Sequence, residues 1–300
     1  MSKFVCGFVS ILGRPNAGKS TLLNALLGTK LAIVAPRPQT TRTSIQGVLT
    51  LSEGQIVFVD TPGIHKSTTL MNKRMMDVVR TSAAADVVLF LADAMSPFTD
   101  EDAQAVDVVK KTEAPAIAVF NKVDQPGAKP RVLTLIERYR GLHDFAAYIP
   151  ISALKGDGVD ILQREILSRL PEGPALYPKD HLTDQPERFL AAEMIREEVL
   201  HLTRQEVPHS VAVIIDQWED TPKLRRIAAT IYVERAGQKA ILIGAGGALL
   251  KKIGTMARLE IEKLAGKKVF LQTFVKVRPN WREDPEFLRQ ADWRSMVGIE

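Results

Sequence analysis

Short apolar runs alternate with helical patterns through the first 170 residues. Five runs bounded by turn residues predict strands, at residues 4–12, 55–60, 86–93, 115–120 and 148–151. Between and after them, apolar positions recur at helical spacing near 19–28, 70–83, 99–112, 129–141 and 158–170. This alternation predicts an α/β fold, with a mostly parallel sheet and helices on both faces. Such sheets bind ligands beyond the carboxyl ends of their strands.

The pattern changes after residue 170. Residues 171–186 contain four prolines and no periodic spacing of apolar positions, which predicts a linker. A helical pattern over 187–204 follows, and then β-rich runs at 210–217 and 226–233. We therefore predict two domains, a first over 1–170 and a smaller α+β domain over 187–300.

Composition places the chain among ordinary globular proteins, because 45% of its 300 residues are hydrophobic and 25% are charged. A single cysteine, Cys6, excludes an internal disulfide, and no paired Cys or Cys/His spacing indicates a zinc site. A reducing, cytoplasmic compartment fits best. The apolar start of the chain shows no cleavage site, and no apolar run approaches about eighteen residues, so we expect neither a signal peptide nor a membrane span.

The first chemical motif is a phosphate-binding loop, GRPNAGKS, at residues 13–20. Gly13 and Gly18 let the backbone curl so that successive N–H groups face phosphates, Lys19 reaches the outer phosphates, and the Ser20 hydroxyl can bind Mg²⁺. The other members of this cradle are Arg14, Pro15, Asn16 and Ala17. Because a strand pattern precedes the loop and a helical pattern follows it, a glycine-rich turn without a ligand is the weaker alternative.

A second motif, Asp60-Thr61-Pro62-Gly63, stands at the end of a predicted strand. A carboxylate at this position can hold the Mg²⁺ shell, and Gly63 leaves a backbone N–H to approach a γ-phosphate. Alone, such a turn is a common surface feature. Downstream of a phosphate loop, we expect all four residues to line the nucleotide.

The choice of base rests on Asn121-Lys122-Val123-Asp124, which follows the apolar strand pattern PAIAVF. The Asp124 carboxylate can accept hydrogen bonds from the N1 and exocyclic amine donors of guanine, and adenine has no donor at N1. Asn121 can contact the ring or brace the loop, and the Lys122 stem can pack over the base. Ser152-Ala153 supplies backbone N–H groups towards the guanine carbonyl. The four motifs in this order predict GTP as the nucleotide.

Charge is concentrated near the C-terminus. Residues 223–282 hold fourteen basic and three acidic residues, a net charge of +11 in a chain whose total is +5. A solvated lysine-rich face is the simplest interpretation. A polyanionic partner, either nucleic acid or an anionic membrane surface, is the alternative that we favour.

Together these motifs resemble the translation-factor-like GTPases, and within them the Era family. The resemblance rests on GRPNAGKS, Gln39-Thr40-Thr41-Arg42, DTPGIHK, NKVD, SAL and the basic C-terminal part, and it covers essentially the whole chain. It implies a P-loop GTPase domain and a C-terminal type II KH domain. It also implies hydrolysis of GTP to GDP and phosphate with Mg²⁺, binding to the 3′ end of 16S rRNA, and a role in assembly of the small ribosomal subunit. The family further implies a cytoplasmic monomer that can associate with the inner face of the cell membrane.

The resemblance also assigns roles in the reaction. It implies that Thr41, with Thr40 as the alternative, closes on Mg²⁺ when a γ-phosphate is present. Ile64 occupies the position at which many small GTPases carry a water-orienting glutamine, and an isoleucine cannot hydrogen-bond water. Relatives with this substitution use an asparagine of the phosphate loop, here Asn16, to help hold K⁺ near the phosphates. The implied catalytic set is Asn16, Lys19, Thr41 and Gly63. The neighbouring His65 is an exposed switch residue in our interpretation, with a catalytic base as the alternative.

In the second domain, residues 241–243 lead into Gly244-Ala245-Gly246-Gly247, inside the basic segment. In KH domains such a loop clamps the backbone of single-stranded nucleotides. The RNA contacts implied are Ile243, Gly244, Ala245, Gly246, Gly247, Lys251 and Lys252. A dinucleotide fingerprint lacks its third glycine and its acidic residue, and a helix-capping turn is the plain alternative. Relatives often carry lysine where Ala245 stands, which puts the RNA affinity in question.

Two rival functions remain. A membrane-surface module could use GTP as a timer while its basic segment docks on anionic lipid. A P-loop ATPase or kinase is disfavoured by the NKVD motif. Four aromatic residues of the second domain, Phe270, Phe274, Trp281 and Trp293, are interpreted as core or interdomain packing and not as base-stacking platforms.

Overall fold

The computed structural model describes residues 3–37, 40–64, 69–82, 85–205 and 207–296. These form two compact units. The first contains Met1–Ala32, Thr41–Ser67 and Asn72–Asp184, and the second contains Ile33–Thr40, Thr68–Met71 and Gln185–Glu300. The units therefore do not follow chain order, because a short segment just before Thr41 groups with the C-terminal part.

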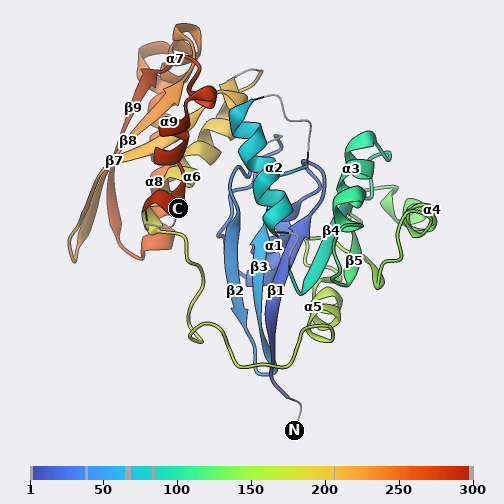
Figure 1. Cartoon of the computed structure of the whole chain (residues 1–300). Coiled ribbons are helices and arrows are strands. Elements are labelled where there is room, and N and C mark those ends of the chain that lie inside the picture. The colour runs from blue at the N-terminus through green and yellow to red at the C-terminus, as the bar shows by residue number, and fades with distance from the viewer. Residues whose placement is uncertain (1–2, 38–39, 65–68, 83–84, 206, 297–300) are drawn as a thin grey trace. The chain divides into compact units, whose positions relative to one another are not determined.

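The first unit is built on a six-stranded sheet in the order β2-β3-β1-β4-β5-β6 (Figure 1). Its strands are β1 (Val5–Leu12), β2 (Ile45–Thr50), β3 (Gly54–Asp60), β4 (Val87–Asp93), β5 (Ala116–Asn121) and β6 (Ala147–Pro150). All neighbours pair in parallel except β2, which runs antiparallel to β3. Every residue of β4 is buried, as expected for a central strand covered on both faces.

Helices cover both faces of this sheet (Figure 1). They are α1 (Lys19–Leu27), α2 (Leu70–Ser82), α3 (Asp100–Val109), α4 (Ala128–Arg140) and α5 (Val159–Leu167). Side chains of α2, α3 and α4 share one core with β4 and β5, in which Phe90, Phe120 and Tyr139 are packed ring against ring. The helices α1 and α5 contact each other and the β1–β3 side. This core fixes the strands whose carboxyl ends carry the motifs.

The elements predicted for the first domain are confirmed, with ends that differ by at most about three residues. The edge strand β2 was not predicted. Its residues mix polar and apolar side chains without strict alternation, and three of the six are buried while the other three are partly buried. Burial by tertiary packing, and not a local pattern, makes this segment a strand.

Residues 171–184, within the predicted linker, are irregular but belong to the first unit. Val48 N–H of β2 donates to the Leu182 carbonyl at 2.8 Å, and the Thr183 hydroxyl donates to the Gln46 carbonyl at 2.6 Å. The fully buried Gln55 accepts from the N–H groups of Leu176 and Tyr177 at 2.8 and 2.9 Å. The segment is thus a strap along the edge strand β2, and we use that name for residues 171–184 below.

The second unit has a three-stranded sheet in the order β7-β8-β9 (Figure 1). Its elements are α6 (Glu187–Leu202), β7 (Ala212–Asp220), β8 (Leu224–Val233), α7 (Ala236–Ile243), α8 (Ala248–Ala265), β9 (Lys268–Val277), α9 (Pro285–Gln290) and α10 (Trp293–Met296), with 3₁₀ turns at Val207–His209, Ala245–Gly247 and Trp281–Glu283. β7 is antiparallel to β8, and β8 is parallel to β9. The core lies between this sheet and α6, α7 and α8.

The aromatic residues of the second unit divide into two groups. Trp281 and Trp293 are buried, which confirms their interpretation as packing residues. Phe270 and Phe274 are 46% and 49% exposed, so they are not core residues of this unit, and their interpretation as interdomain packing stays a prediction. On β9 it is Val269 and Val275 that are buried, and strand alternation turns the two phenylalanines to the opposite face.

Among the described residues, no single helix is long and apolar enough to cross a membrane. The helical stretches Ala236–Ile243 and Ala245–Ala265, bent by 48° where they meet, pass that test only when taken as a pair.

Candidate functional site

The motifs of the first unit meet at the carboxyl edge of its sheet because of strand register. Ile11 lies beside Asp60, Leu12 beside Phe90, and Asp93 beside Asn121. Parallel neighbours therefore end together, and the loops that leave β1, β3, β4 and β5 share one edge. The register therefore places the motifs that follow these strands at the edge where such sheets bind ligands.

Two glycines of the phosphate loop stand where a side chain would collide. Gly13 has φ +151°, and a Cβ there would lie 2.4 Å from the Leu91 carbonyl oxygen. Gly18 has φ +100°, and a Cβ would lie 2.3 Å from Nδ2 of Asn121. The loop can therefore pass close to both β4 and Asn121 only with glycine at these positions. We call residues 121–124 the guanine motif below. Asn16 adopts φ +61° without being a glycine.

Lys19 is buried at the start of α1, and its ammonium closes over the loop. Lys19 Nζ donates to the carbonyls of Gly13 and Arg14 at 3.0 and 2.9 Å. Burial lowers the pKa of Lys19 to about 8, while the nearby Asp60 carboxylate opposes this shift. A phosphate that neutralises the ammonium would therefore be favourably bound here.

Three oxygen-bearing side chains converge beside the loop. Ser20 Oγ lies 2.7 Å from Asp60 Oδ2 and 2.8 Å from Thr41 Oγ1, and Thr41 Oγ1 lies 3.3 Å from the same carboxylate oxygen. The other oxygen, Asp60 Oδ1, is buried and has no hydrogen-bond partner among the described residues. Burial raises the pKa of Asp60 to about 6, although the Lys19 charge and hydrogen bonds from Ser20 and Thr41 oppose the rise. A hard cation such as Mg²⁺ prefers this set of oxygen ligands.

The two switch threonines differ in position. Thr41 is the one that joins Ser20 and Asp60. The hydroxyl of Thr40 instead donates to the carbonyls of Arg37 and Ala35, at 2.6 and 3.2 Å. Of the two alternatives, the geometry therefore favours Thr41 as the cation ligand. Gln39 of the same motif lies outside the described residues.

The turn after β3 is tightly fitted to the phosphate loop. A Cβ at Gly63 would lie 2.8 Å from the backbone of Pro15, so only glycine allows this approach. The Thr61 hydroxyl donates to the Ile11 carbonyl at 2.8 Å and is buried, which gives Thr61 a bracing role. Ile64 is 1% exposed and packs in the core of the first unit, so its side chain does not face a reacting water. His65 lies outside the described residues.

The guanine motif is braced from two sides. Asn121 Nδ2 donates to the Ala17 carbonyl at 2.9 Å, and the Ala153 N–H donates to Asn121 Oδ1 at 2.9 Å. Asn121 thus ties together the phosphate loop, its own strand and the Ser152-Ala153 loop. The exposed Asp124 carboxylate accepts from the Ser152 hydroxyl at 2.7 Å, which fixes its orientation.

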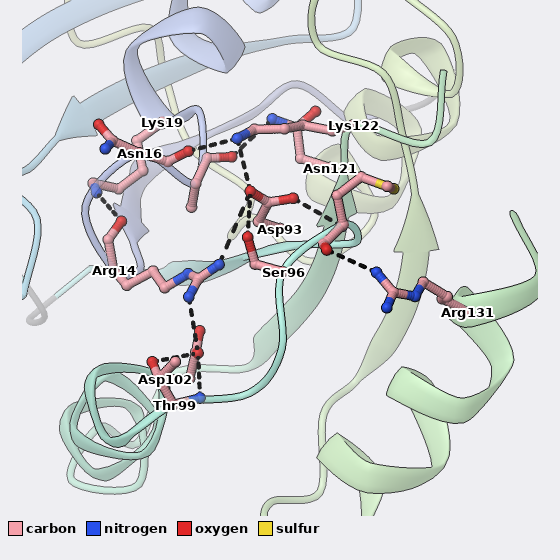
Figure 2. A network of polar contacts seen from close by, with 12 residues as sticks. Arg14, Asn16, Lys19, Asp93, Ser96, Thr99, Asp102, Asn121, Lys122 and Arg131 are labelled. Carbon is pink, nitrogen blue, oxygen red and sulfur yellow. Dashed lines mark hydrogen bonds and ion pairs between the residues drawn. The ribbon is translucent and has the colours of Figure 1, made fainter. Parts of the chain in front are cut away.

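Two acidic residues near this motif carry a polar network that the sequence did not single out (Figure 2). Asp93 ends β4 and accepts from Lys122 Nζ at 2.7 Å, and Asp102 of α3 lies 3.5 Å from Arg14. The signal that could have identified Asp93 is the one used for Asp60, a carboxylate at the carboxyl end of a buried strand. Asp102 has no comparable signal for a contact with Arg14. The spacing Thr99-x-x-Asp102 indicates only an N-terminal cap of α3, which the structure contains.

The glycine loop of the second unit joins two helices. α7 ends at Ile243, Gly244 caps it through an N–H to Ala240 carbonyl bond of 3.0 Å, and Gly246 and Gly247 have φ of +57° and +80°. Capping and ligand binding are thus compatible at the same glycines. Because a helix and not a strand precedes the loop, the dinucleotide fingerprint is excluded. Ala245, Gly246, Lys251 and Lys252 are exposed.

Comparison with known proteins agrees with both units. Residues 8–122 match the family model described as 50S ribosome-binding GTPase, and residues 206–282 match the KH domain model. The chain is 49% identical to GTPase Era of Geobacter metallireducens over 97% of its own length and 98% of that protein. It is 46% identical to GTPase Era of Syntrophus aciditrophicus over 96% of its length and 94% of that protein.

Two solved structures are similar over almost the whole chain. One is Era in complex with MgGDPNP and nucleotides 1506–1542 of 16S ribosomal RNA, with a TM-score of 0.93 at 42% identity, covering 97% of this chain and 99% of that one. The other is a variant of Aquifex aeolicus Era bound to GDP·AlF4⁻, also with a TM-score of 0.93 at 42% identity, covering 96% and 99%.

Proposed function

Since the chain belongs to the Era family of GTPases, we propose that it is an RNA-binding GTPase that assists assembly of the small ribosomal subunit. It hydrolyses GTP to GDP and phosphate with Mg²⁺, and its KH domain binds the 3′ end of 16S rRNA. The observation that carries this function is the likeness, over nearly the full chain, to an Era solved with MgGDPNP and nucleotides 1506–1542 of 16S ribosomal RNA. The family and the fold class expected from the sequence are confirmed.

The phosphates lie in the loop from Gly13 to Ser20 in this proposal. Backbone N–H groups of the loop face them, and Lys19 neutralises the outer phosphates. The hydroxyls of Ser20 and Thr41 and the buried Oδ1 of Asp60 would hold Mg²⁺. When bound, the cation neutralises charge on the β- and γ-phosphates. Gly63 brings backbone close to the loop, where its N–H can approach the γ-phosphate.

Guanine is selected by Asp124, which the Ser152 hydroxyl orients. The sequence prediction that the Ser152 and Ala153 N–H groups face the guanine carbonyl is not met in this structure, because they donate to the Asp157 carbonyl and to Asn121 Oδ1, each at 2.9 Å. Asn121 holds the phosphate loop and the Ser152-Ala153 loop together, and we assign it this bracing role and no direct contact with the guanine ring. The stem of Lys122 can still cover the base, because its ammonium is anchored at the phosphate loop.

Exchange of Asp124 tests the nucleotide preference. The change Asp124→Asn replaces a carboxylate acceptor by an amide. The amide N–H can donate to the carbonyl that xanthine carries at C2, where guanine has its exocyclic amine. We expect GDP affinity to fall by at least about 100-fold and XDP affinity to rise, since a buried donor left unpaired is costly. Competition of GDP, XDP and ADP against a labelled nucleotide measures this. Stronger ADP than GDP binding by the wild type would refute the assignment of GTP.

Hydrolysis lacks the usual water-orienting glutamine, because Ile64 is buried in the core. In the proposed mechanism Asn16 helps to hold K⁺ beside the phosphates, where a positive charge stabilises the transition state. The Asn16 side chain is exposed, and Figure 2 shows its amide on the side of the loop away from Lys122. The two sides of the residue can thus serve different partners.

RNA binding is assigned to the loop Gly244–Gly247 and the first turn of α8. Positive φ values at three glycines keep the backbone bare of side chains, which allows a nucleic acid backbone to approach. Lys251 and Lys252 supply positive charge six and seven positions after Ala245. Ile243, partly buried before the loop, borders the apolar groove expected for the bases.

Location and oligomeric state follow from the proposed partner. A protein that binds the small ribosomal subunit acts in the cytoplasm, and we propose that it does so as a monomer. Peripheral attachment to the inner face of the cell membrane through the basic segment is the second expectation. Sedimentation with vesicles of anionic lipid, in the presence of competing RNA, separates the two: persistence on the vesicles would favour the membrane.

A further inference from the structure

A single carboxylate, Asp93, connects the two loops that hold the nucleotide (Figure 2). Its Oδ2 accepts from Lys122 Nζ of the guanine motif at 2.7 Å. The same ammonium donates to the Asn16 carbonyl of the phosphate loop at 2.8 Å. Lys122 thus spans from one loop to the other while its charge is held by a residue that belongs to neither.

Asp93 is itself firmly held at the end of β4. Its Oδ1 accepts from the Met95 N–H at 2.9 Å, and Oδ2 also accepts from the Ser96 hydroxyl at 3.0 Å. Its side chain is 8% exposed. Burial alone would raise the pKa of Asp93, but the bonds from Lys122, Met95 and Ser96 lower it below the ordinary value, so the carboxylate is charged.

Arg14 brings a second cation from the phosphate loop to the same carboxylate. Arg14 Nη2 lies 3.9 Å from Asp93 Oδ2, and Arg14 Nη1 lies 3.5 Å from Asp102 Oδ2. The Arg14 side chain is only 13% exposed. Its guanidinium therefore lies between the phosphate loop and the carboxylates of Asp93 and Asp102, and it points towards Asp102 on α3 (Figure 2).

The loops that this network joins contain two strained residues. Asn16 and Lys122 have φ of +61° and +71°, a region that residues other than glycine adopt at a cost. Their surroundings must hold them there, and the Lys122 to Asn16 hydrogen bond joins the two directly. Loss of the charge that fixes Lys122 would let both relax.

We propose that Asp93 is a positioning residue for guanine nucleotide binding, which holds Lys122 across the phosphate loop and balances the charge of Arg14. This inference rests on the proposed function and adds a residue that touches no nucleotide. Asp93 contacts Lys122 of the guanine motif and lies near Arg14 of the phosphate loop, and neither residue is assigned to the γ-phosphate. Loss of Asp93 should therefore weaken GDP and GTP equally.

Dissociation of GDP labelled with N-methylanthraniloyl measures this in the full chain. Asp93→Asn keeps the shape and removes the charge, and we expect dissociation to accelerate by about ten-fold or more, as for the loss of a charge-assisted hydrogen bond. KM for GTP should rise by a similar factor while kcat stays within about two-fold. A purely structural role would change thermal stability without this separation of KM from kcat.

Asp107→Asn is the matched control. Asp107 lies on α3, is exposed, and pairs only with Lys110 at 3.4 Å among the described ion pairs, so its loss removes the same charge away from the loops. If Asp93→Asn fails to fold, Ser96→Ala loosens the carboxylate and should give a smaller acceleration in the same direction. The inference is overturned if the tested variant releases GDP as slowly as Asp107→Asn.

The variant Arg14→Gln tests whether Asp93 balances the charge of Arg14 as well as holding Lys122. With Asp93 neutralised, Arg14 keeps Asp102 at 3.5 Å, whereas Lys122 loses its carboxylate, so one negative charge fewer balances the two cations. Adding Arg14→Gln to Asp93→Asn should therefore slow GDP release relative to Asp93→Asn alone. Faster release from the double variant would refute the charge-balancing part. Wild-type protein that binds no labelled GDP would instead refute the proposed function.

Discussion

Asp60 is the residue at which burial, proton binding and metal binding compete. Burial raises its pKa to about 6. Above that pH the carboxylate is ionised and can bind Mg²⁺, and below it a proton must first be displaced. We expect the Mg²⁺ concentration needed for half-maximal nucleotide retention to be constant between about pH 7 and 8 and to rise up to about ten-fold per pH unit below about pH 6.

Magnesium titrations of labelled GTP-analogue retention, from pH 5 to pH 8, check this expectation. GDP retention in EDTA serves as the control, because it does not require cation binding by Asp60. A magnesium requirement that is the same at pH 5 and pH 7.5 would contradict a raised pKa at this carboxylate.

Substitution of Asn16 tests whether K⁺ supports GTP hydrolysis in a site that has no water-orienting glutamine. If its side chain helps to hold K⁺, turnover of the wild type should be several-fold faster in K⁺ than in Na⁺ buffer, and Asn16→Ala should remove that difference. Phosphate release at saturating GTP is the measurement. Equal rates in both salts for wild type and variant would eliminate the cation role.

Single residues were predicted best where a motif ties the residue type to a chemistry. Gly13, Gly18, Ser20 and Asp60 occupy the geometry that their motif requires. Arg14 was taken only as part of the cradle, because its partners Asp93 and Asp102 lie far along the chain. Ion pairs between distant segments depend on the fold, and no local spacing of residues in the sequence predicts them.

At the scale of elements, the sequence predicted neither the edge strand β2 nor the strap that runs along it. Proline content identified residues 171–184 as irregular, but the hydrogen bonds that fix them come from Gln46, Val48 and Gln55 more than a hundred positions earlier. The buried strands and amphipathic helices were predicted because their periodicity is local. An irregular segment has no such period, so its packing is visible only in the fold.

Gln55 is the residue on which the strap depends most. Its amide donates to the Tyr177 carbonyl at 2.9 Å, and its carbonyl accepts from Leu176 and Tyr177. Gln55→Leu should cost about 2 kcal/mol of local stability, because partners of a removed hydrogen-bonding group remain unsatisfied. Hydrogen exchange of the amides at 176–182 should then accelerate by about 30-fold.

Ser52→Ala is the control for the strap, since Ser52 is exposed in the β2–β3 turn and bonds only to Glu53 among the bonds described here. Its exchange rates at 176–182 should stay within about two-fold of wild type. Unchanged protection in Gln55→Leu would show that other contacts hold the strap.

For the whole molecule, motifs and charge predicted a GTPase domain followed by a basic domain, and the resemblance to the Era family implied that the second is a KH domain. The boundaries of the compact units were not predicted. Residues Ile33–Thr40 group with the second unit, where Val34 N–H donates to Glu197 of α6 at 2.8 Å. A segment between two motifs of the first unit carries no sequence signal that it belongs elsewhere, because the pairing with α6 spans more than 160 positions.

The central claim, an RNA-binding GTPase, is tested most directly by filter binding of a single-stranded oligonucleotide with the 16S rRNA 3′-end sequence. Wild type, Gly246→Asp and Gly28→Asp are compared, each with a GTP analogue and with GDP. Both glycines have positive φ and no atom within 4 Å of an added Cβ, so the two variants differ in location and not in strain.

We expect wild type and Gly28→Asp to bind with the same dependence on the bound nucleotide, and binding to weaken steeply with salt. Gly246→Asp should bind at least about ten-fold more weakly, because a carboxylate would face the RNA phosphates. Equal binding by Gly246→Asp and wild type, whatever the nucleotide, would contradict the account.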